Sequence, residues 1–496
     1  MNFVSSRHFA RPVPRFSCLL SALGVALAAT VVIGCGGSSG SGSVTPLKGS
    51  TAVVVLASST ANDQISSFNL TLSSLTLTSQ SGKTVTVFST PQTAEYMHLN
   101  GSVEPLTTVS VPQDVYTSAT ATLGPSGYPT CVGLEPGGGL LTNGSIGGYR
   151  TQSDVTVNLP APITVTGTTM GLALDLQVSK SVSSFSCVPA TNGAASITPT
   201  FNLTPVVIAA QPTNSTNGMA TGLYGLIATV NSGGTSFSVT GADGPKWQVS
   251  SSSSTVFQGV TGASQLAAGM PVDMDMAIQA DGSLLATRVA VYDTNATSLT
   301  LVKGPVIQMA GSQPTLFVLS AEYEGPLLAG LGSSSPIAFN FGNTVFQTSG
   351  QLTNVQSLPF PASFKATNMV DGQNVFVSTH ALTISGGPAY EPATTMALLP
   401  QTIDGTVSAV SSSGNFTTYT VTLAPYDLFT DLAVQAGQTT LLNHPNSVVV
   451  YVDSNTQMLN TTPADVGSVL RFSGLVFNDQ GTLRMDCAQI NDGVAE

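Results

Sequence analysis

The sequence predicts an all-β protein of several domains, with an N-terminal β-sandwich followed by three small β-barrels. Charged residues make up 8% of the chain, against roughly 25% in ordinary soluble domains. The helix formers Glu, Lys and Arg are therefore scarce. Serine, threonine, glycine and β-branched residues are abundant instead, and these favour strands and turns. The chain is too long for one hydrophobic core, so it divides into several domains.

Residues 1–34 have the layout of a secretory signal. Three arginines, Arg7, Arg11 and Arg15, precede an uncharged stretch from Phe16 to Ile33, which is a positive region followed by an apolar one. The apolar stretch is also long enough for an uncleaved transmembrane anchor, which is the alternative. Val32-Ile33-Gly34-Cys35 resembles the lipobox of bacterial lipoproteins. In that family the cysteine is lipidated and becomes the first residue after cleavage.

Residues 35–50 form a Gly/Ser-rich linker directly after this cysteine. Such a linker is a flexible coil that separates a folded body from a surface. We therefore expect a lipid on Cys35 to hold the exported protein at a membrane. The residue after the cysteine is Gly36 rather than the Asp that resembles an inner-membrane retention signal. Placement at the outer membrane or cell surface is favoured.

The charge of the chain argues against nucleic-acid partners. Cleavage after residue 34 removes three of the 13 basic residues and none of the 25 acidic ones, leaving a net charge of −15. A negative surface repels phosphate backbones. No segment after the signal is apolar enough to cross a membrane as a helix.

Three cysteines remain beside Cys35. Cys131 and Cys187 both lie in Ser/Gly/Pro-rich stretches of the N-terminal domain, and in an oxidising compartment they are the expected disulfide pair. Cys487 lies in an alternating apolar stretch, which predicts a buried small residue rather than a reactive thiol.

Residues 51–210 are predicted to form the β-sandwich domain. Leu172, Leu174, Leu176 and Val178 alternate with smaller or polar residues, which is the period of a half-buried strand. A second alternation changes phase at Ser73-Ser74, which indicates a β-bulge. Further strands are expected at 84–88, 154–159 and 162–165. Residues 211–220 form a polar linker.

A degenerate repeat extends from residue 221 to the C-terminus, with copies at 221–300, 301–400 and 401–496. Each copy opens with a glycine and an apolar strand, later has a threonine in a short strand, and then a glycine that begins another strand. The openings are Gly225, Gly304 and Gly405, the threonines are Thr255, Thr344 and Thr456, and the later glycines are Gly269, Gly372 and Gly467. The middle copy is divergent and has an insertion of about a dozen residues before Gly372.

Each copy is expected to contain three strands, a short helical turn and two more strands. Thr462-Pro463 has the residues of a helix start and Gly467 closes the turn, and 262–269 is expected to form a similar turn. In copies one and three, Asp281-Gly282 and Gln480-Gly481 predict the last hairpin. This element order is that of an OB-like small barrel.

At this level the chain resembles two uncharacterised families. The repeat is similar to a small-barrel domain of unknown function that occurs in tandem in bacterial envelope proteins, through its Gly-Thr-Val start and Asp-Ser-Asn-Thr step. The stretches 68–77 and 112–123 resemble an uncharacterised lipoprotein domain of β-sandwich type. Neither resemblance implies catalytic residues.

The chain offers few groups for catalysis. After the signal its histidines are His98, His380 and His444, in different domains, and no HExxH, paired CxxC or GxSxG motif is present. Asp273 and Asp275 lie two apart on one predicted strand. A solvated strand face is the expected role for them, and a Ca²⁺ site is the alternative. Asp453 and Asn455 are expected in a turn.

Trp247 is the only tryptophan. It is expected in a barrel core or at a barrel end, with stacking on a sugar ring as the alternative. The first copy, residues 221–293, has a net charge of −3, which is the wrong sign for binding oligonucleotides.

These observations predict a lipid-anchored envelope protein that is not an enzyme, with no cofactor and no metal. Binding, adhesion or envelope scaffolding through the β domains is the expected role, with a glycan or an envelope protein as partner. A secreted hydrolase that uses scattered Ser, Asp and His residues is one alternative. A Ca²⁺-dependent glycan-binding module is the other.

Overall fold

The computed structural model describes most of the chain after the linker, and residues 47–496 form one compact unit. The described residues are 47–492 apart from 61–66, 97–98, 100–101, 136–138, 146–152, 184–195, 242–244, 296–299, 311–314, 320–321, 325–335, 353–354, 381–390, 425–427, 434–441 and 460–463. Cys35, Cys187, His98 and Thr462-Pro463 lie outside them. The lipidation site and the Cys131–Cys187 disulfide therefore stay predictions.

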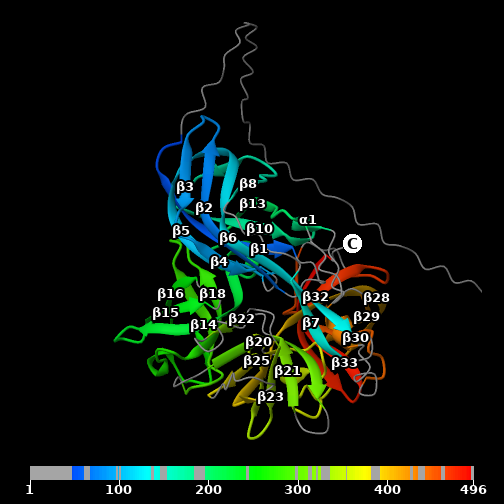
Figure 1. The fold of residues 1–496 in the computed structure, drawn as a ribbon. Coiled ribbons are helices and arrows are strands. Elements are labelled where there is room, and N and C mark those ends of the chain that lie inside the picture. Colours follow the sequence, from blue (N-terminus) through cyan, green and yellow to red (C-terminus); the bar gives the residue numbers. More distant parts are fainter. Residues whose placement is uncertain are drawn as a thin grey trace, which may run out of the picture. The chain divides into compact units, whose positions relative to one another are not determined.

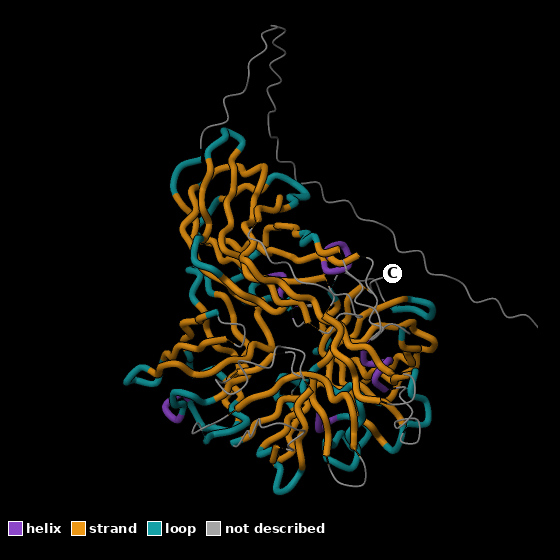
Figure 2. The backbone as a smooth tube through the Cα atoms, in the orientation of Figure 1, coloured by secondary structure: helices purple, strands orange, loops and turns teal. Residues whose placement is uncertain are grey.

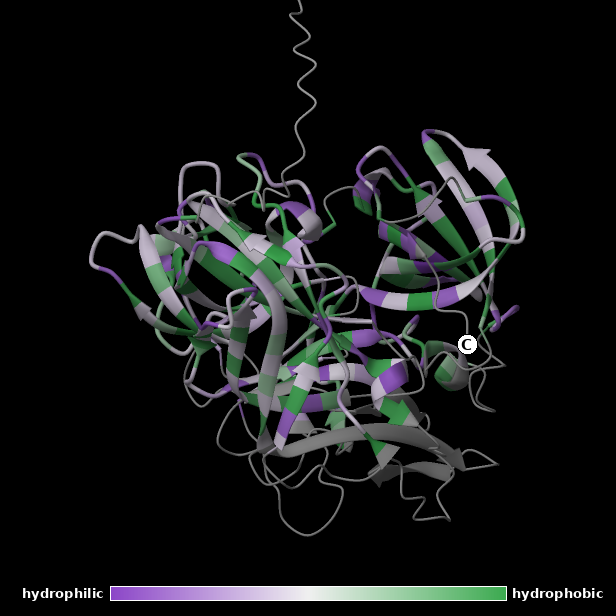
Figure 3. Cartoon of the chain, turned by 90° about the horizontal axis from the view of Figure 1, so that it is seen from above, coloured by the Kyte–Doolittle hydropathy of each residue, from purple (hydrophilic) through white to green (hydrophobic). Residues whose placement is uncertain are grey.

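The all-β prediction is confirmed (Figure 2). Among the described residues, the helices are α1 (Val178–Ser181), α2 (Leu428–Ala433) and three single 3₁₀ turns, η2 (Ser215–Asn217), η3 (Ala263–Gln265) and η4 (Val355–Ser357). The described chain contains no helix with the length and hydropathy needed to span a bilayer. The strands alternate hydrophobic and hydrophilic residues (Figure 3), because successive side chains point to opposite faces.

The N-terminal domain is a sandwich of two sheets (Figure 1). One sheet has the strand order β13-β10-β1-β5, and the other has β3-β2-β6-β7 with β4 on β2 and with β8 and β9 on β6. A third, two-stranded sheet joins β11 and β12. The strands are β1 (Ser50–Thr60), β2 (Ser67–Ser79), β3 (Thr84–Phe88), β4 (Gln92–Glu95), β5 (Glu104–Pro112), β6 (Asp114–Glu135), β7 (Gly139–Ser145), β8 (Ser153–Val157), β9 (Ile163–Val165), β10 (Thr169–Gln177), β11 (Val182–Ser183), β12 (Ser196–Ile197) and β13 (Phe201–Val206).

The core of the sandwich lies between the two main sheets. The alternating residues Leu172, Leu174 and Leu176 of β10 pack there against Leu75 and Leu77 of β2, all fully buried. The pairing of β2 with β6 shifts register between Leu72 and Ser74, which confirms the predicted bulge. The bulge returns the leucines on both sides of it to the core face.

Barrel 1 is a closed five-stranded barrel. Its strands are β14 (Met219–Val230), β15 (Ser236–Gly241), β16 (Lys246–Ser250), β18 (Pro271–Ile278) and β19 (Leu284–Ala290), with a short extra strand β17 (Val256–Gln258). When the five strands are numbered in chain order, they neighbour one another around the barrel in the order 1-2-3-5-4-1. The parallel pairing of β16 with β19 closes the barrel. This is the connectivity of the predicted OB-like barrel.

Barrels 2 and 3 repeat this connectivity. Barrel 2 contains β20 (Thr300–Ala310), β21 (Thr315–Leu319), β22 (Glu322–Glu324), β23 (Pro336–Asn340), β24 (Val345–Thr348), β25 (Asn374–Thr379), β26 (Glu391–Pro392) and β27 (Thr395–Leu398). Its last strand is divided into β26, which pairs with β23, and β27, which pairs with β25. Barrel 3 contains β28 (Gln401–Ser413), β29 (Phe416–Leu423), β30 (Ser447–Val452), β31 (Gln457–Met458), β32 (Val469–Asp479) and β33 (Thr482–Asp492).

The repeated threonine has the same contact in each barrel. Each hydroxyl donates a hydrogen bond to a backbone carbonyl of the last strand or the residues that continue it. Thr255 binds Ala286 O at 2.7 Å, Thr344 binds Ala393 O at 2.6 Å and Thr456 binds Cys487 O at 2.7 Å. The short strand that follows each threonine pairs in parallel with that last strand. The threonine therefore fixes this extra strand on the barrel.

The later glycine of each repeat closes a bulge on the first strand. Gly269, Gly372 and Gly467 have φ of 86°, 92° and 94°, a conformation that glycine adopts at low cost. Their N–H groups donate to the carbonyls of Ile227, Val306 and Val407, respectively, at 2.7–2.8 Å. The first-strand register shifts directly after the same three residues. The glycine that recurs in the sequence thus forms the same hydrogen-bonded bulge contact in all three barrels.

We predict that Gly225→Ala destabilises the protein. A Cβ at Gly225 would lie 2.4 Å from the carbonyl oxygen of Thr240, and such overpacking costs about 1–3 kcal/mol. Gly262→Ala is the control, because its Cβ would meet open space and its φ is extended. Thermal unfolding should show a lower transition temperature for the first variant only. Equal transition temperatures would contradict the packing at Gly225.

Candidate functional site at the junction of the first two barrels

Strand β18 of barrel 1 is buried along its whole length. Its inward residues Met274, Met276 and Ile278 belong to the barrel core. Its outward residues Asp273 and Asp275 would face water if barrel 1 stood alone, since neighbouring side chains on a strand point to opposite sides. They are instead 0% and 8% exposed. The prediction of a solvated strand face is therefore wrong, because barrel 2 contributes groups to this face.

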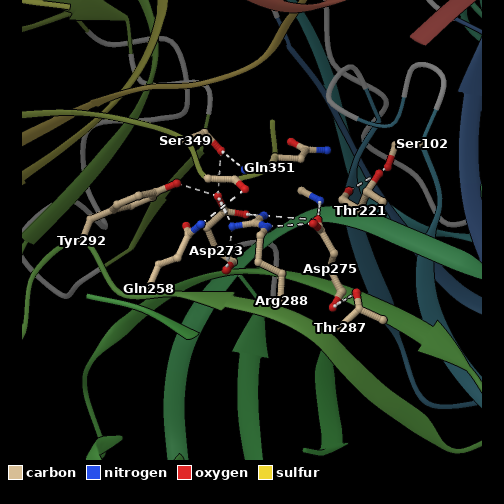
Figure 4. Close-up of polar contacts among 12 residues, drawn as sticks. Ser102, Thr221, Gln258, Asp273, Asp275, Thr287, Arg288, Tyr292, Ser349 and Gln351 are labelled. Carbon is tan, nitrogen blue, oxygen red and sulfur yellow. Dashed lines mark hydrogen bonds and ion pairs between the residues drawn. The ribbon is translucent and has the colours of Figure 1, made fainter. Parts of the chain in front are cut away.

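The two carboxylates bind one arginine (Figure 4). Arg288 lies opposite Asp275 on β19. Its Nη2 lies 2.6 Å from Asp273 Oδ1 and its Nε lies 2.7 Å from Asp275 Oδ2. Burial by itself lowers the pKa of the Arg288 guanidinium, but the charges of Asp273 and Asp275 outweigh it and hold this pKa well above its usual range. The arginine therefore stays charged inside the protein.

Further donors complete the coordination of both carboxylates. The hydroxyl of Tyr292 donates to Asp273 Oδ2 at 2.6 Å, and the hydroxyl of Ser349, from barrel 2, donates to the same oxygen at 3.2 Å. The backbone N–H of Gly222 donates to Asp275 Oδ1 at 2.9 Å. Burial first, and then the charge of Asp273, raise the pKa of Tyr292 well above its usual value. Tyr292 therefore remains a hydrogen-bond donor at any physiological pH.

This arrangement holds domains together rather than a metal. One guanidinium and two carboxylates leave one negative charge, which the hydroxyl and N–H donors stabilise. The arginine occupies the oxygen atoms that Ca²⁺ would need. Within the described ranges, no three His, Cys, Asp or Glu residues are grouped so as to hold a metal ion.

Apolar and aromatic contacts surround the ion cluster. Tyr292 packs on Phe376 of barrel 2 with ring centroids 5.4 Å apart. The ammonium group of Lys303 lies 4.1 Å from the ring centroid of Tyr224. Tyr224 and Lys303 directly precede the equivalent glycines Gly225 and Gly304, so matching strands of the two barrels face each other. The shared apolar contact consists of Ala290, Tyr292, Leu301, Phe376, Ala397 and Leu399, with Tyr224 and Leu226 at its margin.

The sandwich docks on barrel 1 through Trp247. The indole N–H of this residue donates to Pro105 O at 2.8 Å, and the side chain is 3% exposed. It packs in one cluster with Val54 and Leu56 of β1. The expected core role of Trp247 is confirmed, and the tryptophan also joins two domains.

The insertion of barrel 2 docks on barrel 3. Its Phe360 ring packs on Tyr451 and Phe477, with centroids 5.0 and 6.0 Å away. The side-chain amide of Gln373 donates to Val476 O at 2.8 Å. Barrel 3 also contacts the polar linker, where Gln457 Nε2 donates to Thr213 O at 2.7 Å. Each domain is therefore tied to the next by contacts between residues far apart in the sequence.

Of the two histidines that the structure describes, His380 contacts a carboxylate and His444 lies at the surface. His380 Nε2 lies 3.0 Å from Asp293 Oδ2, and the Ser378 hydroxyl donates to the same carboxylate oxygen at 2.8 Å. In a catalytic triad the nucleophilic hydroxyl contacts the histidine instead. His444 lies exposed in a turn of barrel 3. Asp453 accepts the N–H of Asn455 at 2.8 Å, which confirms the predicted turn.

Cys487 is buried in the core of barrel 3, as predicted, and is a free cysteine. Burial is the main cause that raises the pKa of its thiol far above the usual value. The thiolate form that reacts with electrophiles is therefore absent at neutral pH.

Comparison with known sequences supports the identity of one domain. A family described as Domain of unknown function (DUF5666) matches residues 224–290. The match spans barrel 1 from within β14 to the end of β19, and includes Asp273, Asp275 and Arg288 but neither Tyr292 nor Ser349. No curated protein shows significant sequence similarity to the chain.

Sequence reasoning singled out Asp273 and Asp275 but missed their partners. Regular counting from the predicted Asp281-Gly282 hairpin would place Thr287 opposite Asp275. Arg288 takes that position because the register shifts between Asp275 and Met276, and no residue in the sequence marks this bulge. Ser349 belongs to another repeat, and no signal in its local sequence marks it as a partner of Asp273.

We predict that Arg288→Met destabilises the protein strongly. Removing one partner of a buried ion pair leaves an uncompensated charge and costs about 3–5 kcal/mol. Chemical unfolding monitored by circular dichroism measures the effect. Lys246→Met is the control, because Lys246 is exposed on the same barrel, and it should leave the midpoint unchanged. An unchanged midpoint for Arg288→Met would contradict the assigned role of the cluster.

A second prediction concerns Asp486 of β33, which is 5% exposed. Its Oδ2 has no hydrogen-bond partner among the described residues. Burial, and to a lesser degree the charge of Asp453, raise the pKa of Asp486 to about 6. The pKa of Asp486 is thus higher in the folded protein than in the unfolded chain, so the protonated carboxyl stabilises the fold relative to the carboxylate. This stabilisation is fully present below the unfolded-state pKa near 4 and is lost as the pH rises through the folded-state pKa of about 6.

Asp486→Asn should therefore raise the unfolding free energy at pH 7.5 by up to about 3 kcal/mol, and by much less at pH 4. Chemical unfolding at both pH values measures the difference. Asp465→Asn, an exposed position in the same barrel, should give no such pH-dependent gain. A gain equal at both pH values would contradict the raised pKa.

Proposed function

We propose that this chain is a lipid-anchored protein of the bacterial cell envelope that acts without catalysis, as a scaffold or binding protein. The observation that carries this proposal is the buried junction at Asp273, where side chains from two domains complete one charge cluster. Flexibly linked catalytic or binding modules would not need to bury charge at their contacts, since burying it is costly unless every partner is present. The junction suits a body that keeps its domains in a fixed arrangement.

Domain contacts on the usual ligand-binding surfaces of the barrels also support a scaffold role. Small barrels of this connectivity bind ligands on the outer face of the second and third strands and on the adjoining loops. In barrel 3, Phe416 and Tyr451 lie on that face and pack in one cluster with Phe360 of barrel 2. In barrel 1, the last hairpin lies against the sandwich, where the Thr108 hydroxyl donates to Gly282 O at 3.5 Å. The barrels thus use these surfaces to contact other domains.

The sequence supports the location that this role requires. The lipobox-like Val32-Ile33-Gly34-Cys35 and the Gly/Ser linker are typical of a lipid-tethered protein. The net charge of −15 expected after cleavage disfavours nucleic acid as a partner. We propose the outer membrane or cell surface as the location, and an envelope glycan or envelope protein as the partner.

The test of anchoring is Cys35→Ala. Acylation needs the thiol of this cysteine, so the variant should lose metabolic labelling by a palmitate analogue and should retain its signal peptide. Cys487→Ala is the control and should keep full labelling, because Cys487 is buried in barrel 3. Normal acyl labelling of Cys35→Ala would falsify the proposed anchor. Membrane fractionation of both variants shows whether labelling and membrane attachment change together.

A further inference from the structure

The outer face of one sandwich sheet has an ordered array of hydroxyl groups. We define the hydroxyl face by its residues on β2, β3, β6 and β8. These are Ser74, Thr76, Thr78, Thr84, Thr86, Ser118, Thr120, Thr122 and Thr156. The other side of these strands is the apolar core, which includes Leu75, Leu77 and Ala119. Because side chains alternate along a strand, the hydroxyl residues all point away from that core.

Strand register places these hydroxyls in rows. Thr76 pairs with Thr86 on one side and with Thr120 on the other, and Thr120 pairs with Thr156. Residues directly opposite one another share a sheet face. This row therefore crosses four neighbouring strands, with about 4.8 Å between strands and about 6.7 Å to the next row along each strand.

Two shorter rows lie beside the first. One joins Thr84, Thr78 and Ser118. The other joins Ser74, Thr122 and Asp154, whose side chains are connected by hydrogen bonds of 3.0 and 2.7 Å. Asp154 is the only charged residue in the three rows, and it lies at their margin. The hydroxyl face is therefore both nearly uncharged and regular in two directions.

The hydroxyl face is open to solvent, whereas the opposite sheet is used inside the protein. Thr84, Thr86, Ser118, Thr120 and Thr156 are all exposed. The outer face of the other sheet packs on barrel 1 through Val54 and Leu56 of β1. Each sheet thus has one face in the sandwich core, and the two remaining faces differ in what they contact.

We propose that the hydroxyl face binds an uncharged polysaccharide chain. A threonine or serine hydroxyl both donates and accepts hydrogen bonds, as sugar hydroxyls do, and an uncharged polymer escapes the repulsion that a strongly negative protein exerts on anionic ones. Each contact is weak in water. A long polymer laid over several rows gains affinity from many such contacts at once. The inference deepens the proposed envelope role, on which it rests, by naming the partner class.

The test is co-sedimentation of the full-length protein, purified in detergent, with insoluble cellulose and chitin. Wild-type protein should sediment with at least one of them, and 1 M NaCl should not release it, because the contacts are uncharged. The triple variant T76V/T120V/T156V removes three hydroxyls from one row and keeps shape and strand propensity. It should bind about tenfold more weakly.

Two further variants separate the hydroxyl effect from other causes. T76S/T120S/T156S retains the hydroxyls and should bind like wild type. T229V/T406V/T417V changes three exposed strand threonines outside the sandwich and should also bind like wild type. Circular dichroism verifies that each variant is folded.

Three results would overturn the inference: no sedimentation of wild-type protein, equal binding by T76V/T120V/T156V, or release by salt. Retention of the wild-type protein in growing ice, without polysaccharide binding, would assign the face to ordered water instead. None of these outcomes bears on palmitate labelling at Cys35, so this proposal and the proposed anchor fail separately.

Discussion

The carboxylate of Asp273 is the group on which the arrangement of the first two barrels depends. It is fully buried, and its charge is tolerated only because Arg288, Tyr292 and Ser349 all bind it. Two of these residues come from barrel 1 or the segment directly after it, and the third comes from barrel 2. A partly satisfied buried charge would be more destabilising than an apolar contact of the same shape. The cluster therefore favours one docked arrangement of the two barrels over the alternatives.

The other junctions use different chemistry for the same purpose. The sandwich and barrel 1 meet at a buried tryptophan with a satisfied N–H, and barrels 2 and 3 meet at tilted and edge-to-face aromatic rings and a buried amide. Large aromatic side chains bury much apolar area, and their polar atoms fix the geometry. The insertion in the divergent middle repeat forms part of this junction, because its Phe360 ring packs against barrel 3. Divergence from the repeat pattern and contact with a neighbour coincide in this segment.

The domains differ in which of their outer faces contact a neighbour and which are exposed. Barrel 3 uses the outer face of its second and third strands for a neighbouring domain, while the sandwich presents an uncharged row of threonines on its exposed sheet. Such hydroxyl groups form hydrogen bonds with water on a surface that has few charges. The same groups suit partners that are themselves rich in hydroxyls and carry no charge.

The sequence by itself determined the fold class, the repeat and the elements inside each barrel. Strand alternation, the recurring Thr255, Thr344 and Thr456, and the glycines with positive φ act over short distances, within one strand or one turn, so they can be recognised without coordinates. Only the tertiary structure decided the environment of Asp273 and Asp275. Their local pattern is that of an ordinary strand face, and the hydroxyl that reaches Asp273 from barrel 2 belongs to Ser349, more than 70 residues away in the chain. Contacts between outer faces of separate domains leave no periodic signal in either segment, which is why the junction could be found only in the folded chain.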